Sequence, residues 1–413
     1  MTTNRSDVNK LTVAVVCSAF GTELTHLAVP LFAIKVLNAT PFDMGILTAI
    51  GTLPNILFGL LVGGLISNES VKNILVRMDV ARALLLLFLA IATYLGHANI
   101  VILYGVVFLT GVAALFFDVS YYSFVPLLVG RDDLVSANSR IETGRTASSL
   151  FGNAVAGGLI LLIGFSSAFL IDALTFLISA VAIYLISWRA VPDPIGSSES
   201  RNDKPSLRAQ IWRGFSFVGS NKMVLALTVS GAIFNFFTAM EMALVSYFFV
   251  NTLNLSVTLI AIAFTFASIG AVLGAYLSEY SQRIIGFGGT IIIGFLMNAA
   301  SSLIVALTYG EHAMLIVSTA FLVGAIGGTQ ASIVQLSLRQ AVVPKEISTT
   351  VNAAVRFILW GVLPIGGLLG GLVASAVGVR ITLILAAFGL VGAALVPLFS
   401  PVRRLKVLPT PAA

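Results

Sequence analysis

The sequence predicts an all-α membrane protein in which twelve transmembrane helices form two pseudo-symmetric six-helix bundles. Three observations support this: the composition, a series of long apolar segments, and a repeat that relates the two halves of the chain. Of the 413 residues, 58% are hydrophobic and only 10% are charged, whereas a soluble domain has about 25% charged residues. Together with a mean hydropathy of +1.03, this composition excludes a soluble enzyme, a disordered chain and a nucleic-acid-binding domain.

Twelve apolar segments are long enough to cross a bilayer, which takes about 20 helical residues. They must be helical, because lipid offers no partners for free backbone N–H and C=O groups. The expected helices lie near residues 11–34, 43–66, 74–95, 99–120, 138–163, 168–187, 222–250, 256–279, 288–308, 313–338, 350–376 and 380–400.

One long polar break divides the chain into six helices and six. It spans residues 188–221 and is rich in Pro, Ser, Arg and Asp. We therefore expect an N-terminal six-helix bundle over residues 1–187, a cytoplasmic linker over 188–221, and a C-terminal six-helix bundle with a short basic tail over 222–413.

The basic residues predict the orientation of the chain. If the N-terminus is cytoplasmic, 18 of the 23 Lys and Arg residues fall in cytoplasmic segments and two, Lys35 and Arg380, fall in outer loops. Cytoplasmic loops of membrane proteins carry such an excess. We therefore expect the chain to lie in a bacterial-type inner membrane with both termini on the cytoplasmic side. The first apolar segment, which has no cleavage pattern before it, is expected to act as signal and anchor.

The two halves repeat each other in sequence. PLLVGRDDLVSANSR, which leads into the fifth helix, matches VVPKEISTTVNAAVR, which leads into the eleventh, and Asn138 and Asn352 open the two helices. The glycine clusters GNAVAGG and PIGGLLGG follow at corresponding places. Two parallel repeats of this kind are typical of transporters that bind substrate between two halves.

With this repeat, the chain resembles the major facilitator superfamily over almost its whole length. Within that family it is similar to the drug-efflux branch that includes macrolide-efflux and enterobactin-exporter-like proteins. The stretches PLLVGRDDLVSANSRIETG and SAFLIDALTFLISAVAIYLI carry this similarity. The resemblance implies the major facilitator fold and an alternating-access efflux transporter, of the multidrug antiporter type, for an amphipathic compound such as a drug, macrolide or siderophore.

Two alternatives stay open: a facilitator that imports a small metabolite, and a non-transporting membrane sensor or scaffold. An enzyme is not expected, and the absence of a Walker A sequence argues against direct use of ATP. We expect protons as the coupling ion, a small-molecule substrate, contact with the lipid bilayer, no nucleic acid, no cofactor or metal, and a monomer.

The chain departs from the family pattern at two places. The loop between helices two and three reads GGLISNESVKN, with Ser67 where the family usually has an Asp. In the fifth helix, Gly152 and Asn153 stand where antiporters of the family have Gly-Pro, which weakens the inference of antiport from this motif.

A charged side chain at membrane depth costs free energy, so each one in the sequence indicates either a function or a specific partner. Glu23 and His26 lie three residues apart in the first helix, on one face. This pair could carry a proton or meet a cationic substrate, or it could be a hydrogen bond that only satisfies both groups.

Two further charges are candidates for substrate binding or proton coupling. Glu241 lies in the outer half of the seventh helix without a charged neighbour at helical spacing, so its partner must be another helix, the substrate or a proton. Arg356 in the eleventh helix can stack on Trp360 four residues on. Because Arg stays protonated, it could hold an anionic group or pair with a carboxylate.

A second set of charges lies near the cytoplasmic ends of the helices. We expect these residues to form a network between helices that clamps the cytoplasmic face as a gate: Asp79, Arg82, Asp118, Glu142 and Arg145. Asp172, near an outer helix end, is expected to cap a helix or act in a gate.

Overall fold

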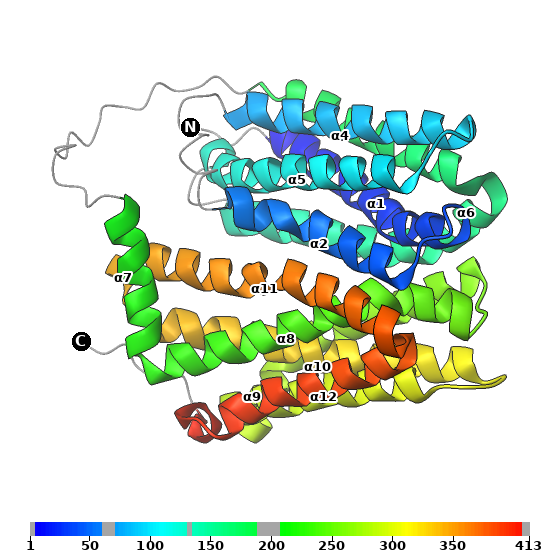
Figure 1. Ribbon diagram of the computed structural model, residues 1–413. Helices are drawn as coiled ribbons and strands as arrows, with labels where there is room; N and C mark the ends of the chain where they lie inside the picture. Colours follow the sequence, from blue (N-terminus) through cyan, green and yellow to red (C-terminus); the bar gives the residue numbers. More distant parts are fainter. Residues whose placement is uncertain (1–4, 60–70, 130–133, 188–206, 407–413) are drawn as a thin grey trace.

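The computed structural model describes residues 5–59, 71–129, 134–187 and 207–406. Every regular element in these ranges is a helix, and no strand occurs in them. Most helices lie roughly parallel, and both ends of the chain lie at the same end of the molecule (Figure 1). We call this end the terminal end and the opposite end the distal end.

The helices form two groups that follow each other along the chain. The N-terminal half contains α1 (Arg5–Lys35), α2 (Pro41–Phe58), α4 (Val71–Tyr94), α5 (Ile100–Leu128) and α6 (Leu134–Tyr184). The C-terminal half contains α8 (Lys222–Tyr247) with the π-helical turn η1 (Phe248–Thr252), α9 (Val257–Leu307), α10 (Ala313–Val342), α11 (Ser348–Val377) and α12 (Val379–Leu398). Helix α7 (Leu207–Ser220) crosses the terminal end at a steep angle to the others (Figure 1).

Two elements of 51 residues, α6 and α9, each contain two spans. The backbone leaves helical geometry at Gly164 (φ 78°, ψ 174°) in α6 and at Gly286 (φ 75°, ψ 173°) in α9. Positive φ is open to glycine because it has no Cβ. The expected breaks after residues 163 and 279 are therefore single-glycine bends rather than polar loops.

The described residues hold nine helices long and apolar enough to cross a membrane. Because α6 and α9 are bent pairs, these nine supply eleven spans. The 24-residue α4, which carries Lys72, Arg77, Asp79 and Arg82, is the twelfth.

Some of the observed boundaries differ from the expected ones. The fourth expected span continues to Leu128, eight residues further than predicted. The segment 188–221 contains α7. The end of the expected helix 43–66, and most of the unusual loop that follows it, lie outside the described residues.

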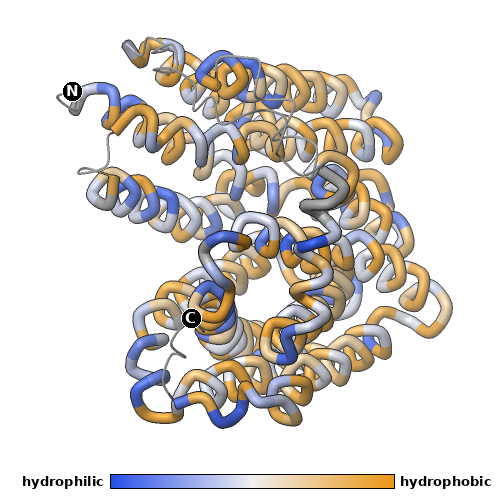
Figure 2. Tube along the Cα trace, turned by 90° about the vertical axis from the view of Figure 1, so that its left-hand side faces the viewer, coloured by the Kyte–Doolittle hydropathy of each residue, from blue (hydrophilic) through white to orange (hydrophobic). Residues whose placement is uncertain are grey.

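The two halves share one apolar core at the distal end. Its buried side chains come from both halves, and include Phe32, Met44 and Phe169 together with Leu244, Phe248 and Val257. At the terminal end the buried clusters are separate: two belong to the N-terminal half and two to the C-terminal half. Figure 2 looks along the helices from the terminal end and shows hydrophobic residues along most of each helix. The halves are thus joined at the distal end and divided at the terminal end.

Small residues allow the close contact between the halves. A Cβ on Gly371 of α11 would lie 2.9 Å from the Cα of Gly45 of α2. A Cβ on Gly157 of α6 would lie 2.4 Å from the Cβ of Ala261 of α9. These contacts bring α2 against α11 and α6 against α9, as small residues do between membrane helices.

Candidate functional site

Glu23 lies halfway along α1 and faces α6. Its Oε1 accepts a hydrogen bond from the Ser149 hydroxyl (2.6 Å), and its Oε2 accepts one from Nδ2 of Asn153 (3.2 Å). Gly152 makes room for this approach, because a Cβ there would lie 2.8 Å from the Cβ of Glu23. His26 is exposed, and the two hydrogen bonds that Glu23 makes go to α6 rather than to His26.

Asn153 carries this network across to the other half of the molecule. Its Nδ2 donates to the hydroxyl oxygen of Ser268 on α9 (3.2 Å) and to the carbonyl oxygen of Ser149 (3.2 Å), besides Glu23. An amide nitrogen has two hydrogens, so three acceptors compete for two donors. Glu23, Asn153 and Ser268 therefore form a polar link between α1 and α6 on one side and α9 on the other.

From the sequence, Asn153 stands out only as a departure from a family motif. The signal that could have identified it is a hydrogen-bonding side chain next to a glycine at membrane depth, on a helix expected to contact the other half. Its partners depend on how α1, α6 and α9 pack, and the sequence alone does not give that packing.

Glu241 is buried inside the C-terminal half, with 7% of its surface exposed. Its polar neighbour is Ser302 of α9, whose hydroxyl lies beside the carboxyl without making a hydrogen bond of ordinary geometry. Among the described residues, no ion pair involves Glu241. The structure thus separates Glu241 from the link at Glu23.

Arg356 is exposed on α11, and its guanidinium lies 5.2 Å from the centre of the Trp360 ring. It also interacts electrostatically with Asp118 of α5, in the other half. Asp118 interacts in the same way with Arg82 and Arg145. Asp118 is thus the member of the predicted charge network that faces a charge of the C-terminal half.

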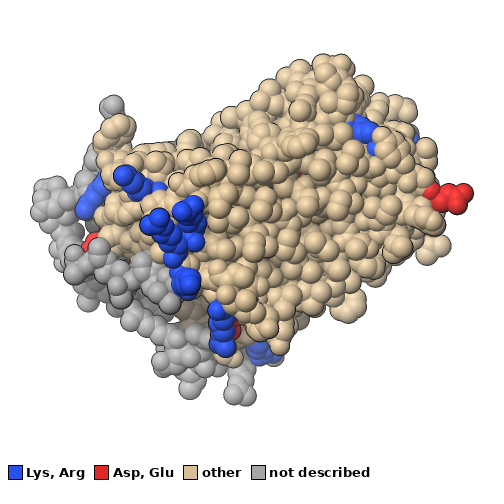
Figure 3. All heavy atoms as spheres, turned by 90° about the horizontal axis from the view of Figure 1, so that it is seen from below, with Lys and Arg blue, Asp and Glu red and all other residues tan. Residues whose placement is uncertain are grey.

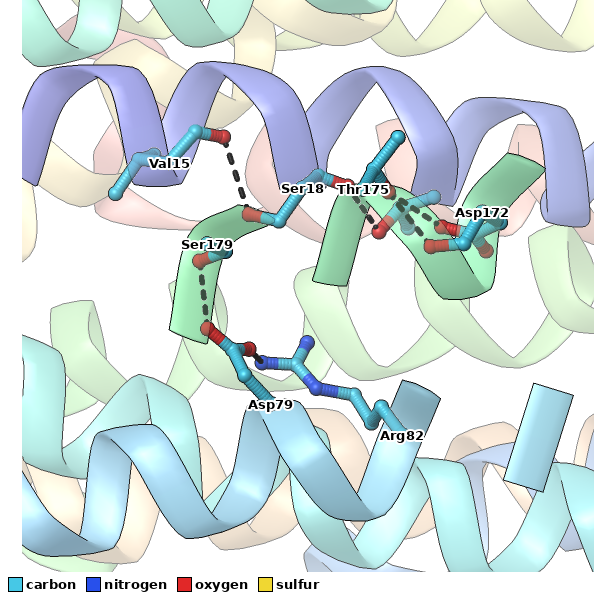
Figure 4. A network of polar contacts seen from close by, with 8 residues as sticks. Val15, Ser18, Asp79, Arg82, Asp172, Thr175 and Ser179 are labelled. Atoms are coloured by element: carbon cyan, nitrogen blue, oxygen red, sulfur yellow. Dashed lines mark hydrogen bonds and ion pairs between the residues drawn. The ribbon is translucent and has the colours of Figure 1, made fainter. Parts of the chain in front are cut away.

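Asp79 and Arg82 form a buried ion pair on α4, with 2.6 Å between Oδ1 and an Nη atom. The Ser179 hydroxyl of α6 donates to the other oxygen of Asp79 (2.6 Å), as Figure 4 shows. The Arg82 guanidinium lies between the rings of Phe117 and Phe176, 4.5 and 4.3 Å from their centres. All of these contacts lie within the N-terminal half, so this pair ties α4, α5 and α6 together rather than joining the halves.

The second predicted pair is looser. Glu142 and Arg145 of α6 are 4.0 Å apart, and 56% and 35% of their side-chain surfaces are exposed. Arg145 also lies over the ring of Tyr121, 5.7 Å from its centre. A pair this open contributes little to stability and remains available for other partners.

Asp172 is buried on the second span of α6 and faces α1. Its carboxylate accepts a hydrogen bond from the hydroxyl of Thr25 on α1. It accepts another from the hydroxyl of Thr175, as Figure 4 shows. Gly21 of α1 makes room for it, since a Cβ there would collide with both Asp172 and Thr175. The expectation of a helix cap is wrong here: the side chain reaches across to α1 instead of binding its own helix end.

Comparison with known proteins shows which family has this architecture. The family model of the Major Facilitator Superfamily matches residues 11–365. The chain belongs to the Major Facilitator Superfamily. It is 22% identical over 365 residues to macrolide efflux protein A of Streptococcus pyogenes, covering 86% of this chain and 87% of that protein.

Solved structures of major facilitator proteins share the fold. A bacterial homologue of the human lysosomal transporter Spinster, in an inward-facing and occupied conformation, superimposes with a TM-score of 0.76 at 14% identity, covering 96% of this chain and 97% of that one. The nucleoside transporter NupG gives 0.75 at 12% identity, covering 95% and 98%. A bacterial homologue of the iron transporter ferroportin, in an inward-facing state, gives 0.75 at 15% identity, covering 96% and 99%.

These comparisons confirm the fold class predicted from the sequence. The chain is a major facilitator transporter and not an enzyme, and its described residues form a helical fold. The twelve spans counted above agree with this fold.

Proposed function

We propose that this major facilitator protein is a proton-coupled exporter of an amphipathic organic compound and works by alternating access. The observation that carries the proposal is the link from Glu23 through Asn153 to Ser268. A carboxylate is the chemical group in this link that can gain or lose a proton, and the link joins the two halves that must move apart.

The competition of three acceptors for the two amide hydrogens of Asn153 provides a way to couple proton uptake to movement of the halves. An ionised Glu23 accepts hydrogen bonds on both oxygens, and bonds to a charged acceptor are stronger than bonds to a neutral one. When Glu23 takes up a proton, its hold on the Asn153 amide weakens. The amide hydrogens then go to Ser149 and Ser268, which changes the contact between the halves.

The conformation supports an inward-facing state with cytoplasmic termini. The halves share a core at the distal end and have separate cores at the terminal end. On the face shown in Figure 3, Lys and Arg gather mainly at the terminal end, and most of the remaining surface is uncharged. With the terminal end in the cytoplasm, as the excess of positive charge favours, the division between the halves opens inward.

The charges at the terminal end fit a cytoplasmic gate. Asp118 and Arg356 belong to opposite halves and interact electrostatically. Closing the terminal end would bring them together as an ion pair, while Glu142 and Arg145, which are partly exposed, could add further contacts. We propose that Asp118 and Arg356 close this gate and that Asp79 and Arg82 hold α4 in place behind it.

The substrate class follows from the relatives and from the available side chains. The similarity to macrolide efflux protein A favours export of a large amphipathic molecule. His26 and Arg356 are exposed and could hold its polar groups, and the buried Glu241 is a second acid that could take up a proton. We propose a monomer in the bacterial inner membrane, with residues 188–221 as the linker between the bundles.

A flux measurement in liposomes tests the proposal. Purified protein is reconstituted with an internal pH dye and a proton gradient is imposed; macrolides, lipophilic cations and siderophores are then added one at a time. We expect a substrate-dependent proton flux that Glu23→Gln abolishes and Glu279→Gln leaves unchanged, because Glu279 pairs with Arg283 on the surface. Equal flux in wild type and Glu23→Gln would overturn the coupling role of Glu23.

A further inference from the structure

An apolar groove of about 370 Å³ lies in the N-terminal half where α1 meets both spans of α6. Its lining consists of Val16, Cys17, Phe20, Gly144, Ala147, Ser148, Phe151 and Thr175. The polar atoms of its two hydroxyl residues are occupied: Ser148 donates to the carbonyl of Val16, and Thr175 to Asp172. The groove therefore offers an apolar surface in which neither hydroxyl group has a free hydrogen to donate.

The groove opens away from the C-terminal half. In an α-helix successive residues turn by about 100°, so Gly144 and Phe151 lie on nearly the opposite side of their helix from Asn153. Asn153 contacts Ser268 of the C-terminal half. The groove thus faces the outer surface of the N-terminal half, and Phe151 there is 62% exposed. For a helix that spans the bilayer, this side meets lipid.

A positive charge lies at one end of the groove. Arg140, Gly144, Ala147 and Phe151 are spaced by four, three and four residues, which places them in one stripe along α6. Arg140 is exposed, and one of its Nη atoms donates to Oδ1 of Asn9 (3.1 Å). The Arg140 Cα lies about 10 Å along the helix from that of Ala147, on the side of the terminal end. A cation at the membrane surface above an apolar groove matches the two parts of an anionic phospholipid.

We propose that this groove binds one acyl chain of an anionic phospholipid from the leaflet at the terminal end, with the lipid phosphate held by Arg140. Arg binds phosphate with several N–H donors in a fixed fork, and the contact with Asn9 leaves further donors free. The acyl chain fills the groove between α1 and α6. This groove lies on the side of the first span of α6 that is opposite Asn153. Binding at this site requires a phospholipid of the membrane and does not require the transported substrate.

Cys17 provides a built-in reporter, because it lines the groove and is the only cysteine of the chain. The rate of its alkylation by N-ethylmaleimide is measured in detergent while phosphatidylglycerol or phosphatidylcholine with the same acyl chains is added. We expect phosphatidylglycerol to slow alkylation at about five-fold lower concentration than phosphatidylcholine, the equivalent of about 1 kcal/mol for one basic side chain near an anionic lipid.

Two substitutions test the two parts of the site, each with a matched control. Arg140→Gln should abolish the preference for phosphatidylglycerol, and Arg283→Gln, at an exposed arginine of the other half, should keep it. Ala147→Trp should fill the groove and reduce the amount of phosphatidylglycerol retained in native mass spectrometry. Ala154→Trp lies on the same stripe beyond the groove and should retain as much lipid as the wild type.

Four results would overturn the proposal: no protection of the wild-type thiol by either lipid, equal protection by the two lipids, an unchanged preference in Arg140→Gln, and equal lipid retention in Ala147→Trp and Ala154→Trp. Gel filtration of every variant checks that the protein is folded. If the wild-type thiol is not protected by either lipid, the groove is not a lipid site.

Discussion

Asn153 of α6 donates a hydrogen bond to Ser268 of α9, and this bond joins the two halves of the transporter next to Glu23. The same amide nitrogen donates to an ionisable group and to a residue across the interface between the halves. In the proposed transport cycle, protonation of Glu23 and movement of the two halves would therefore affect each other through this one side chain.

Asn153→Ala should uncouple transport from the proton gradient while the protein remains folded. It removes the donor to Glu23, and a hydrogen bond to a charged group contributes about 1.5–3 kcal/mol, so we expect substrate-driven proton flux to fall about tenfold or more. The flux measurement in liposomes checks this. Asn298→Ala is the control, because Asn298 bonds to Gly324 within the C-terminal half. An equal loss in both variants would count against a special role for Asn153.

Gly371→Leu should separate α2 and α11 at the distal end. Any side chain at residue 371 collides with the backbone of Gly45 and Pro41, so the variant should favour a conformation opened at that end. Spin labels at Val36 and Leu307, both exposed at the distal end, should move apart in pulsed electron-resonance measurements on a Cys17→Ser background. Gly361→Leu on the same helix has open space around it and should leave the distance unchanged. A distance that does not change in Gly371→Leu would contradict this account of the distal contact.

Arg82→Met should destabilise the N-terminal half strongly. It leaves the buried carboxylate of Asp79 without its cation, and breaking a buried pair in this way costs about 3–5 kcal/mol. Thermal unfolding in detergent should show a clear fall in Tm. Arg283→Met breaks an exposed pair, for which the loss is at most about 1 kcal/mol. Similar values of Tm for the two variants would mean that the Asp79–Arg82 pair contributes little to stability.

Exchanging the charges of Asp118 and Arg356 should restore closure of the terminal end, which either single change should prevent. Asp118→Arg alone places two cations on opposite sides of the terminal end and should hold it open. The double variant Asp118→Arg, Arg356→Asp restores the attraction between the halves. Pulsed electron-resonance distances across the terminal end, on the same cysteine-free background, should lengthen in the single variant and return in the double variant. A double variant that stays open would remove this pair from the gate.

The sequence predicted the fold almost completely, because each span is long and apolar and the halves repeat each other. Its errors lie where a single residue replaces a loop. Gly164 bends α6 without the polar break that usually separates two helices, and its positive φ is not visible in the composition.

The candidate site was predicted less completely. Glu23 stands out in the sequence because a carboxylate in an apolar helix is rare. Its partners Ser149 and Asn153 are some 130 residues away, and they depend on the rotation and depth of α6 against α1. Asp172 illustrates the same limit, since its position near a helix end suggested a cap, whereas Gly21 on another helix creates the space that it occupies.

In the alternating-access cycle proposed above, the shared distal core also affects the balance between the two water-accessible states. Opening the distal end exposes to water the apolar side chains that now bury each other there, and each Å² of exposed apolar surface costs about 25 cal/mol. The separate cores at the terminal end stay intact in this movement. In the transport cycle proposed above, the distal core therefore favours the state described here, and the binding of substrate and protons would supply the free energy that overcomes this preference. Any substitution that reduces the buried apolar surface of the distal core should shorten the lifetime of this conformation in the protein without substrate.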